Sequence, residues 1–205
     1  MPVKVTEKVF LPHIERELKA LLGKKVIVGP VAENGSRLAA YAGANEFGAE
    51  ITPKSSAFLA IPLRPEAKER SPRDFNLTPI FPKNGTPYLA LIEGENVTPY
   101  YLLKRKVIIP ERPYLRSTFD KAETQDKLMK VLTDGIRRLI AGTMTADDVM
   151  NALGASLASS VKGQIASNIG PANSGLTMAL KQGKSTTLVD EGLLLKSISW
   201  EVVNA

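Results

Sequence analysis

The stretch 108-IIPERPYLRSTFD-120 decides how the two halves of this chain are joined. The residues before it alternate as in a β-strand, and the residues after it repeat with helical spacing. Pro110 cannot donate a hydrogen bond to a sheet, so the strand must end there, and Pro113 suits the first turn of a helix. We therefore predict a structural corner at Pro110 and Pro113 between a sheet and a long helix.

Arg112, Tyr114 and Arg116 cluster on this corner, and two interpretations of them are open. In the first, Tyr114 packs beneath the corner, while the arginines are solvated or pair with nearby carboxylates such as Glu111 and Asp120. In the second, all three side chains contact another subunit. The sequence favours neither strongly.

The chain before the corner predicts a sheet that carries a long hairpin arm. Residues 53–88 contain seven of the fourteen prolines, which favours an extended, looping arm because proline interrupts helices and sheet ladders. The runs 57–63, 88–95 and 100–109 are typical of strands. In the last run, strict alternation would place Arg105 on the face opposite Lys104 and Lys106.

Helical patterns dominate the remainder. We predict helices over residues 11–23, 38–48, 113–142 and 145–170, and strands over 24–30 and 198–203. Thr145 with Asp148 forms a capping-box variant at the start of one helix. The prediction is a single α+β domain over residues 1–205, with a small mixed or antiparallel sheet packed against one long and several shorter helices.

Few residues suggest catalysis or metal binding. Asp147 and Asp148 could form a metal pair, but their position at a helix start favours capping. Glu46, beside Phe47, could be a site residue, but its position at a helix end favours a solvated carboxylate. His13 is interpreted as a surface or cap-region side chain. The segment KQGKSTT (181–187) lacks the leading glycine of a phosphate-binding loop, and a helix rather than a strand is expected before it.

Composition narrows the classes of function. The chain has no cysteine and one histidine, so thiolate chemistry, disulfides and multi-histidine metal sites are disfavoured. We expect no enzymatic activity, no cofactor and no metal; a small hydrolase would need carboxylates that only folding brings together. No apolar run is long enough to span a membrane and no signal peptide is evident, so we expect a soluble protein made in a cytoplasm.

The net charge is +6, from 27 basic and 21 acidic residues. Positive charge attracts polyanions, and the run LLKRK (102–106) concentrates some of it. A basic nucleic-acid-binding protein is therefore an alternative function, although the charges are otherwise interspersed along the chain.

Three segments, in this order, resemble tail-completion or neck proteins of tailed bacteriophages, the group of the minor tail protein Z and Mu-type virion morphogenesis families. The first, AAYAGANEFGAEITP (39–53), is similar to a pattern of these families, in which a Tyr-Ala pair is followed by an acidic residue, Phe and Gly. Asn45 stands where the family often has His before the acidic residue. The second, YYLLKRKVIIPERPYLRSTFD (100–120), is similar to a strand that runs into an Ile-Pro-x-Arg-Pro-aromatic-Leu joint. The third, 170–202, resembles the Pro-x-Asn-Ser to Ser-Ile ending of the family.

The resemblance implies a structural role in the virus particle. Such proteins form a ring between the head portal and the tail and complete the conduit for the genome. It implies a cyclic homo-oligomer, six- or twelve-fold, with connector-side and tail-terminator-side partners, DNA in the lumen and no membrane. It also implies assembly in the host cytoplasm and a final location in the virion neck. Under this interpretation Arg105, Arg112, Tyr114 and Arg116 are candidate subunit or partner contacts.

Overall fold

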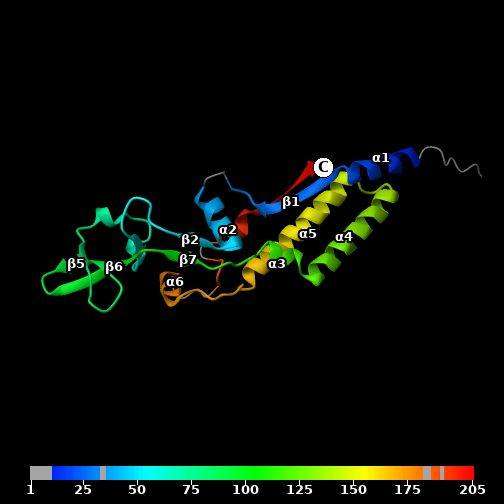
Figure 1. Ribbon diagram of the computed structural model, residues 1–205. Coiled ribbons are helices and arrows are strands. Elements are labelled where there is room, and N and C mark those ends of the chain that lie inside the picture. The colour runs from blue at the N-terminus through cyan, green and yellow to red at the C-terminus, as the bar shows by residue number, and fades with distance from the viewer. Residues whose placement is uncertain (1–10, 33–35, 182–185, 190–191) are drawn as a thin grey trace, which may run out of the picture.

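The computed structural model describes residues 11–32, 36–181, 186–189 and 192–205. The chain folds into a helical body and a smaller β-rich lobe, residues 52–106, which projects from one end of the body (Figure 1). The mixed α+β class predicted from the sequence is confirmed, because helices and small antiparallel sheets both occur.

Helix α5 (Ala146–Ala166) is the centre of the body. It lies between α4 (Ala122–Ile140) and a two-stranded antiparallel ribbon of β1 (Lys24–Pro30) and β8 (Ile198–Asn204) (Figure 1). Helix α1 (Leu11–Leu22) packs against α4 and α5. The ribbon joins segments from the two ends of the chain, which places the predicted first and last strands side by side.

Small residues let these elements approach closely. A Cβ atom on Gly135 of α4 would lie 2.9 Å from a methyl carbon of Val149, and one on Gly154 of α5 would overlap the indole of Trp200. The abundance of alanine, serine and glycine in α5 thus serves packing on two sides. Buried side chains gather along the C-terminal half of α5, with contributions from neighbouring segments: Ala42, Tyr114, Ala158, Val161, Ile165, Leu188, Leu194 and Ile198.

The lobe is connected to the body by a short ribbon. Strand β2 (Ala49–Ile51) follows α2 (Arg37–Phe47) and pairs antiparallel with β7 (Val107–Ile109). Gly48 ends α2 with a φ of 70°, a left-handed conformation that favours glycine. The chain therefore leaves and re-enters the body through adjacent strands.

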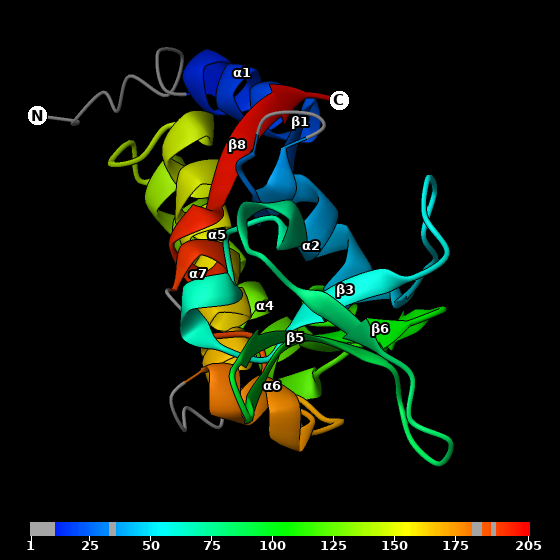
Figure 2. The ribbon, with the colours of Figure 1, turned by 90° about the vertical axis from the view of Figure 1, so that its left-hand side faces the viewer.

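The lobe itself is a four-stranded antiparallel sheet in the order β3-β6-β5-β4, seen in front of the body in Figure 2. Its hairpin is formed by β5 and β6, later in the chain than the expected arm; residues 53–88 instead supply β3, β4 and two 3-10 turns. The lobe elements are β3 (Leu59–Pro62), η1 (Pro65–Ala67), η2 (Pro72–Asp74), β4 (Thr78–Ile80), β5 (Tyr88–Glu93) and β6 (Asn96–Lys104).

Three expectations about continuity were wrong. Within the described residues the strands form three small sheets instead of one, because β1–β8, β2–β7 and the lobe sheet do not share strands. The strand predicted over 100–109 is divided, since β6 ends at Lys104 and β7 begins at Val107 where the lobe meets its connecting ribbon. The helix predicted over 113–142 is also divided, into α3 (Arg116–Phe119) and α4.

The division of the helix occurs at Lys121, whose ψ of 124° is extended. Helical spacing in the sequence continues through this residue, so local propensity alone does not end α3. The start of α3 is held by a carboxylate from α2, as described below, while α4 packs along α5. Tertiary contacts therefore override the local pattern.

Short helices α6 (Gly175–Leu180) and α7 (Leu193–Ser197) complete the body. No helix among the described residues is both long and apolar enough to cross a bilayer.

Candidate functional site

The corner between β7 and α3 is the candidate site. Its backbone forms one hydrogen bond to α2 and one within the corner itself. The Arg112 N–H donates to the carbonyl of Asn45 over 2.6 Å, and the Ser117 N–H donates to the carbonyl of Pro113 over 3.0 Å. Helix α3 begins at Arg116, so Pro113 precedes the helix instead of occupying its first turn as predicted. The corner is present, but Pro110 and Pro113 flank two residues, Glu111 and Arg112, that belong to neither a strand nor a helix.

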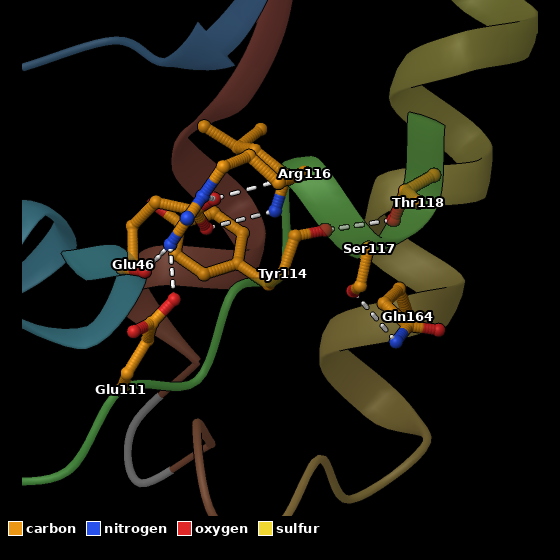
Figure 3. A network of polar contacts seen from close by, with 8 residues as sticks. Glu46, Glu111, Tyr114, Arg116, Ser117, Thr118 and Gln164 are labelled. Carbon is orange, nitrogen blue, oxygen red and sulfur yellow. Dashed lines mark hydrogen bonds and ion pairs between the residues drawn. The ribbon is translucent and has the colours of Figure 1, made fainter. Parts of the chain in front are cut away.

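Glu46 is the central residue of this corner, and the interpretation of Glu46 as a solvated carboxylate was wrong. Its side chain is buried in the last turn of α2, and its two carboxylate oxygens accept the N–H groups of Leu115 and Arg116 over 2.9 and 3.0 Å (Figure 3). The first N–H groups of a helix lack partners within the helix, so an acceptor must come from elsewhere. Glu46 supplies it across 69 residues of sequence.

One signal in the sequence could have revealed that the Glu46 carboxylate has a partner within the protein. A carboxylate near the C-terminal end of a helix is disfavoured by the helix dipole. Such a residue, placed directly before Phe47 and the helix-ending Gly48, indicates a compensating partner elsewhere in the chain. The sequence did not identify that partner because it comes from a distant segment.

Arg116 completes the network. Its guanidinium donates to the Glu46 carboxylate over 3.1 Å, to the Glu46 carbonyl over 2.6 Å and to the Glu111 carboxylate over 2.5 Å (Figure 3). It also lies 5.1 Å from the centre of the Phe47 ring. The hydrogen bonds to Glu111 and Glu46 raise the pKa of Arg116. The pairing with Glu111 agrees with the first interpretation, although half of the side chain stays exposed.

Arg112 is buried and ties together segments that are distant in sequence. Its Nε donates to the carbonyl of Pro171 over 3.0 Å, while its backbone N–H contacts Asn45. Burial lowers the pKa of Arg112. The guanidinium lines a groove of about 740 Å³ between β7 and the segment around α6, together with Lys104, Lys106 and Thr177. Its known contacts are therefore within the chain, and a contact with a second subunit stays a prediction.

Tyr114 lies in the main core cluster with Val161 and Ile165, at 1% exposure. Burial, with a smaller effect of Glu46, raises the pKa of its phenol. Its carbonyl accepts the Thr118 hydroxyl over 2.7 Å. Tyr114 thus packs beneath the corner, as the first interpretation expects, and anchors α3 against α5.

Arg105 takes no part in the corner network. It is exposed at the bend between β6 and β7, where its guanidinium lies 5.7 Å from the centre of the Phe58 ring. Of the four candidate interface residues, Arg105 and Arg116 are exposed and Arg112 and Tyr114 are buried. The structure brings Arg112, Tyr114 and Arg116 onto one segment and leaves Arg105 at the base of the lobe.

The remaining candidates have structural partners. Asp148 forms the predicted capping box with Thr145, whose N–H and hydroxyl lower the pKa of Asp148, while Asp147 pairs with Lys24 over 2.7 Å. The Nδ1 atom of His13 lies 3.0 Å from a terminal guanidinium nitrogen of Arg16. Among the described residues there is no group of three or more His, Asp or Glu side chains that could hold a metal ion. Residues 182–185 of the KQGKSTT segment lie outside the described part of the chain.

Comparison with known proteins found no matching family model, no similar curated protein and no similar solved structure. The likeness to tail-completion proteins therefore rests on the three motifs in the sequence.

Proposed function

We propose that this protein is a non-enzymatic structural subunit that forms a ring in the neck of a tailed bacteriophage, between the head connector and the tail. One observation carries the proposal: a β lobe projects from the body through a two-stranded ribbon whose entry to the body is fixed by the Glu46 network (Figures 1 and 3). A projecting element on a rigid base is suited to reach a neighbouring subunit, and exposed strand edges can pair with a strand of that neighbour.

Exposed apolar side chains add support. Leu22, Val31, Phe47, Ile108 and Phe81 expose more than half of their surface, and they are distributed over both the body and the lobe. Large apolar side chains in solvent favour association, because burying them on a neighbour removes apolar area from water. A ring subunit contacts its two neighbours through different faces, so exposed apolar residues on several faces are expected.

Electron microscopy of assembled particles tests the proposal. The expected result is a ring of this protein between head and tail, and particles made without the protein should contain separate heads and tails. A protein that stays monomeric at high concentration, combined with normal joining of heads and tails in its absence, would contradict the proposal.

A further inference from the structure

The groove beside β7 is bordered by an unpaired strand edge. Its volume is about 740 Å³, and its lining includes all three residues of β7 and none of β2. Successive side chains of a strand point to opposite faces, so the edge of β7 must face a groove that Val107, Ile108 and Ile109 line together. Among the described residues, only β2 pairs with β7. The other edge of β7, on the side of α6, is therefore open to a further strand (Figure 1).

A buried arginine without a carboxylate partner lines the same groove. Arg112 is 6% exposed, and its Nε donates to the carbonyl of Pro171 over 3.0 Å. Its two terminal nitrogens make no hydrogen bond and no ion pair within the described part of the chain. A charge that leaves water without a counter-charge is costly. A carboxylate brought by a ligand would offset this cost, because it can accept two parallel hydrogen bonds from a guanidinium.

The rest of the lining indicates the kind of ligand. Lys104 adds positive charge and makes no ion pair within the described residues, and no described residue that lines the groove is acidic. Apolar side chains lie beside these cations, among them Ile61, Leu176 and Ile108, which is 64% exposed. A nucleic acid would leave this apolar surface uncovered. A peptide can offer a carboxylate, apolar side chains and a backbone that pairs with a strand edge.

We propose that the groove binds an extended segment of a partner protein, which adds a strand to the free edge of β7 and places an Asp or Glu side chain against Arg112. Main-chain hydrogen bonds to β7 provide affinity, and apolar side chains of the segment pack on Ile108 and Leu176. The proposal goes beyond the ring and does not depend on it, because a single chain contains the whole groove.

A display library of random twelve-residue peptides, selected on the full-length protein, tests the groove. The selected peptides should share an Asp or Glu flanked by apolar residues. One of them is then made synthetically, and its binding is measured by fluorescence anisotropy. Replacing its acidic residue by the corresponding amide should weaken binding at least about tenfold, because a hydrogen-bonded charge contributes at least that factor.

Two variants of the protein assign the binding to the groove. Arg112→Gln removes the guanidinium, whereas Lys104→Glu places a carboxylate at an exposed lining residue and leaves Arg112 intact. Each should weaken binding of the peptide at least about tenfold. Arg73→Glu, at an exposed residue of the lobe outside the groove, makes the same change of charge as Lys104→Glu and should bind like wild type. Circular dichroism melting checks folding, and Lys104→Glu decides the test if Arg112→Gln does not fold.

Methylation of single backbone nitrogens of the peptide tests strand pairing. The N–H groups of a strand alternate between its two edges. Of two consecutive residues next to the acidic one, N-methylation should abolish binding at one and be tolerated at the other. Equal effects at both positions would overturn the addition of a strand to β7.

Three further results would overturn the proposal. The first is a selection that yields no peptide, peptides without an acidic residue, or binding that Lys104→Glu leaves unchanged. The second is binding of duplex DNA that Lys104→Glu abolishes, with no peptide selected, which would assign the groove to nucleic acid. The third is self-association that the same variant abolishes, again with no peptide selected, which would assign the groove to a second copy. Absence of a ring from assembled particles would contradict the ring alone and leave this site.

Discussion

The body and the lobe are stabilised in different ways. In the body, α5 buries a nearly continuous face between α4 and the β1–β8 ribbon. In the lobe, few apolar side chains are buried, and polar and aromatic contacts do more: the Tyr101 hydroxyl donates to the carbonyls of Ala67 and Arg70 over 3.2 and 2.9 Å, and Arg70 lies 4.4 Å from the centre of the Phe75 ring. The lobe's buried apolar residues are Ala67, Ala90, Tyr101 and Leu103.

This difference predicts that the body and the lobe contribute unequally to the stability of the protein. Apolar burial is the main favourable contribution to folding, so the body provides most of the free energy of unfolding. A segment with few buried contacts opens at lower free energy than a packed core. The lobe should therefore exchange its amide hydrogens before the body does.

The largest effect is expected for Gly154→Ala in the body. The new methyl group would overlap the Trp200 indole, and overpacking of this kind costs about 3 kcal/mol at the upper end of its usual range. The melting temperature should fall by about 6–12 °C for a chain of this size. Gly163→Ala in the same helix is the control, since nothing lies within 4 Å of the new atom. That variant should be stabilised by up to about 1 kcal/mol, and equal melting of the two variants would contradict the described packing.

A smaller effect is expected where the body meets the lobe. Glu46→Gln replaces a buried carboxylate that accepts two N–H groups of α3 and pairs with Arg116, which should cost about 2 kcal/mol in chemical denaturation. The matched control is Glu50→Gln, which removes an exposed ion pair with Lys106. An exposed pair contributes at most about 1 kcal/mol. If both variants lost equal stability, the proposed role of burial at Glu46 would be wrong.

Within the lobe, Tyr101→Phe should have a local effect of about 1 kcal/mol. The substitution retains the ring and removes the hydroxyl that contacts two carbonyls. Hydrogen exchange should accelerate over residues 65–75 and stay unchanged in α5. Tyr100→Phe is the comparison, because Tyr100 contacts Phe75 and Arg64 through its ring. Acceleration throughout the body would show that the lobe and the body unfold together.

The smallest effect is a pH dependence at the start of α5. Glu17 of α1 accepts the N–H of Ala146 over 3.0 Å, and this bond is the main cause that lowers the pKa of Glu17. A lowered folded-state pKa contributes stability above the unfolded value of about 4.3, which is lost as the pH falls through the folded value. Glu17→Gln should melt below wild type at pH 7, and the difference should vanish in acid. Glu15→Gln, at an exposed residue of the same helix, tests whether any surface carboxylate has this effect.

Local features of the fold could be predicted from the sequence, because their causes lie within a few residues. The Thr145–Asp148 capping box, the end of α2 at Gly48 and the strand over residues 24–30 were all correctly predicted. The capping box and the helix end depend on backbone geometry and side chains at separations of four residues or fewer.

Features that depend on distant segments could not be predicted. The pairing of β1 with β8, the division between α3 and α4, and the capping of α3 by Glu46 all involve contacts that no short pattern records. The interface role of Arg105, Arg112, Tyr114 and Arg116 stays a prediction. The sequence could not tell that Tyr114 and Arg112 turn inward, because burial depends on α5 and on the segment around Pro171.

The pairing of β2 with β7 makes the lobe an insertion in the body. Ile51 lies opposite Val107, so the points at which residues 52–106 depart and return are neighbours in paired strands. Segments with adjacent ends can be lengthened, shortened or exchanged without changing the path of the host chain. Replacing the lobe by a two-residue turn or by a foreign hairpin should consequently leave the fold of the body unchanged.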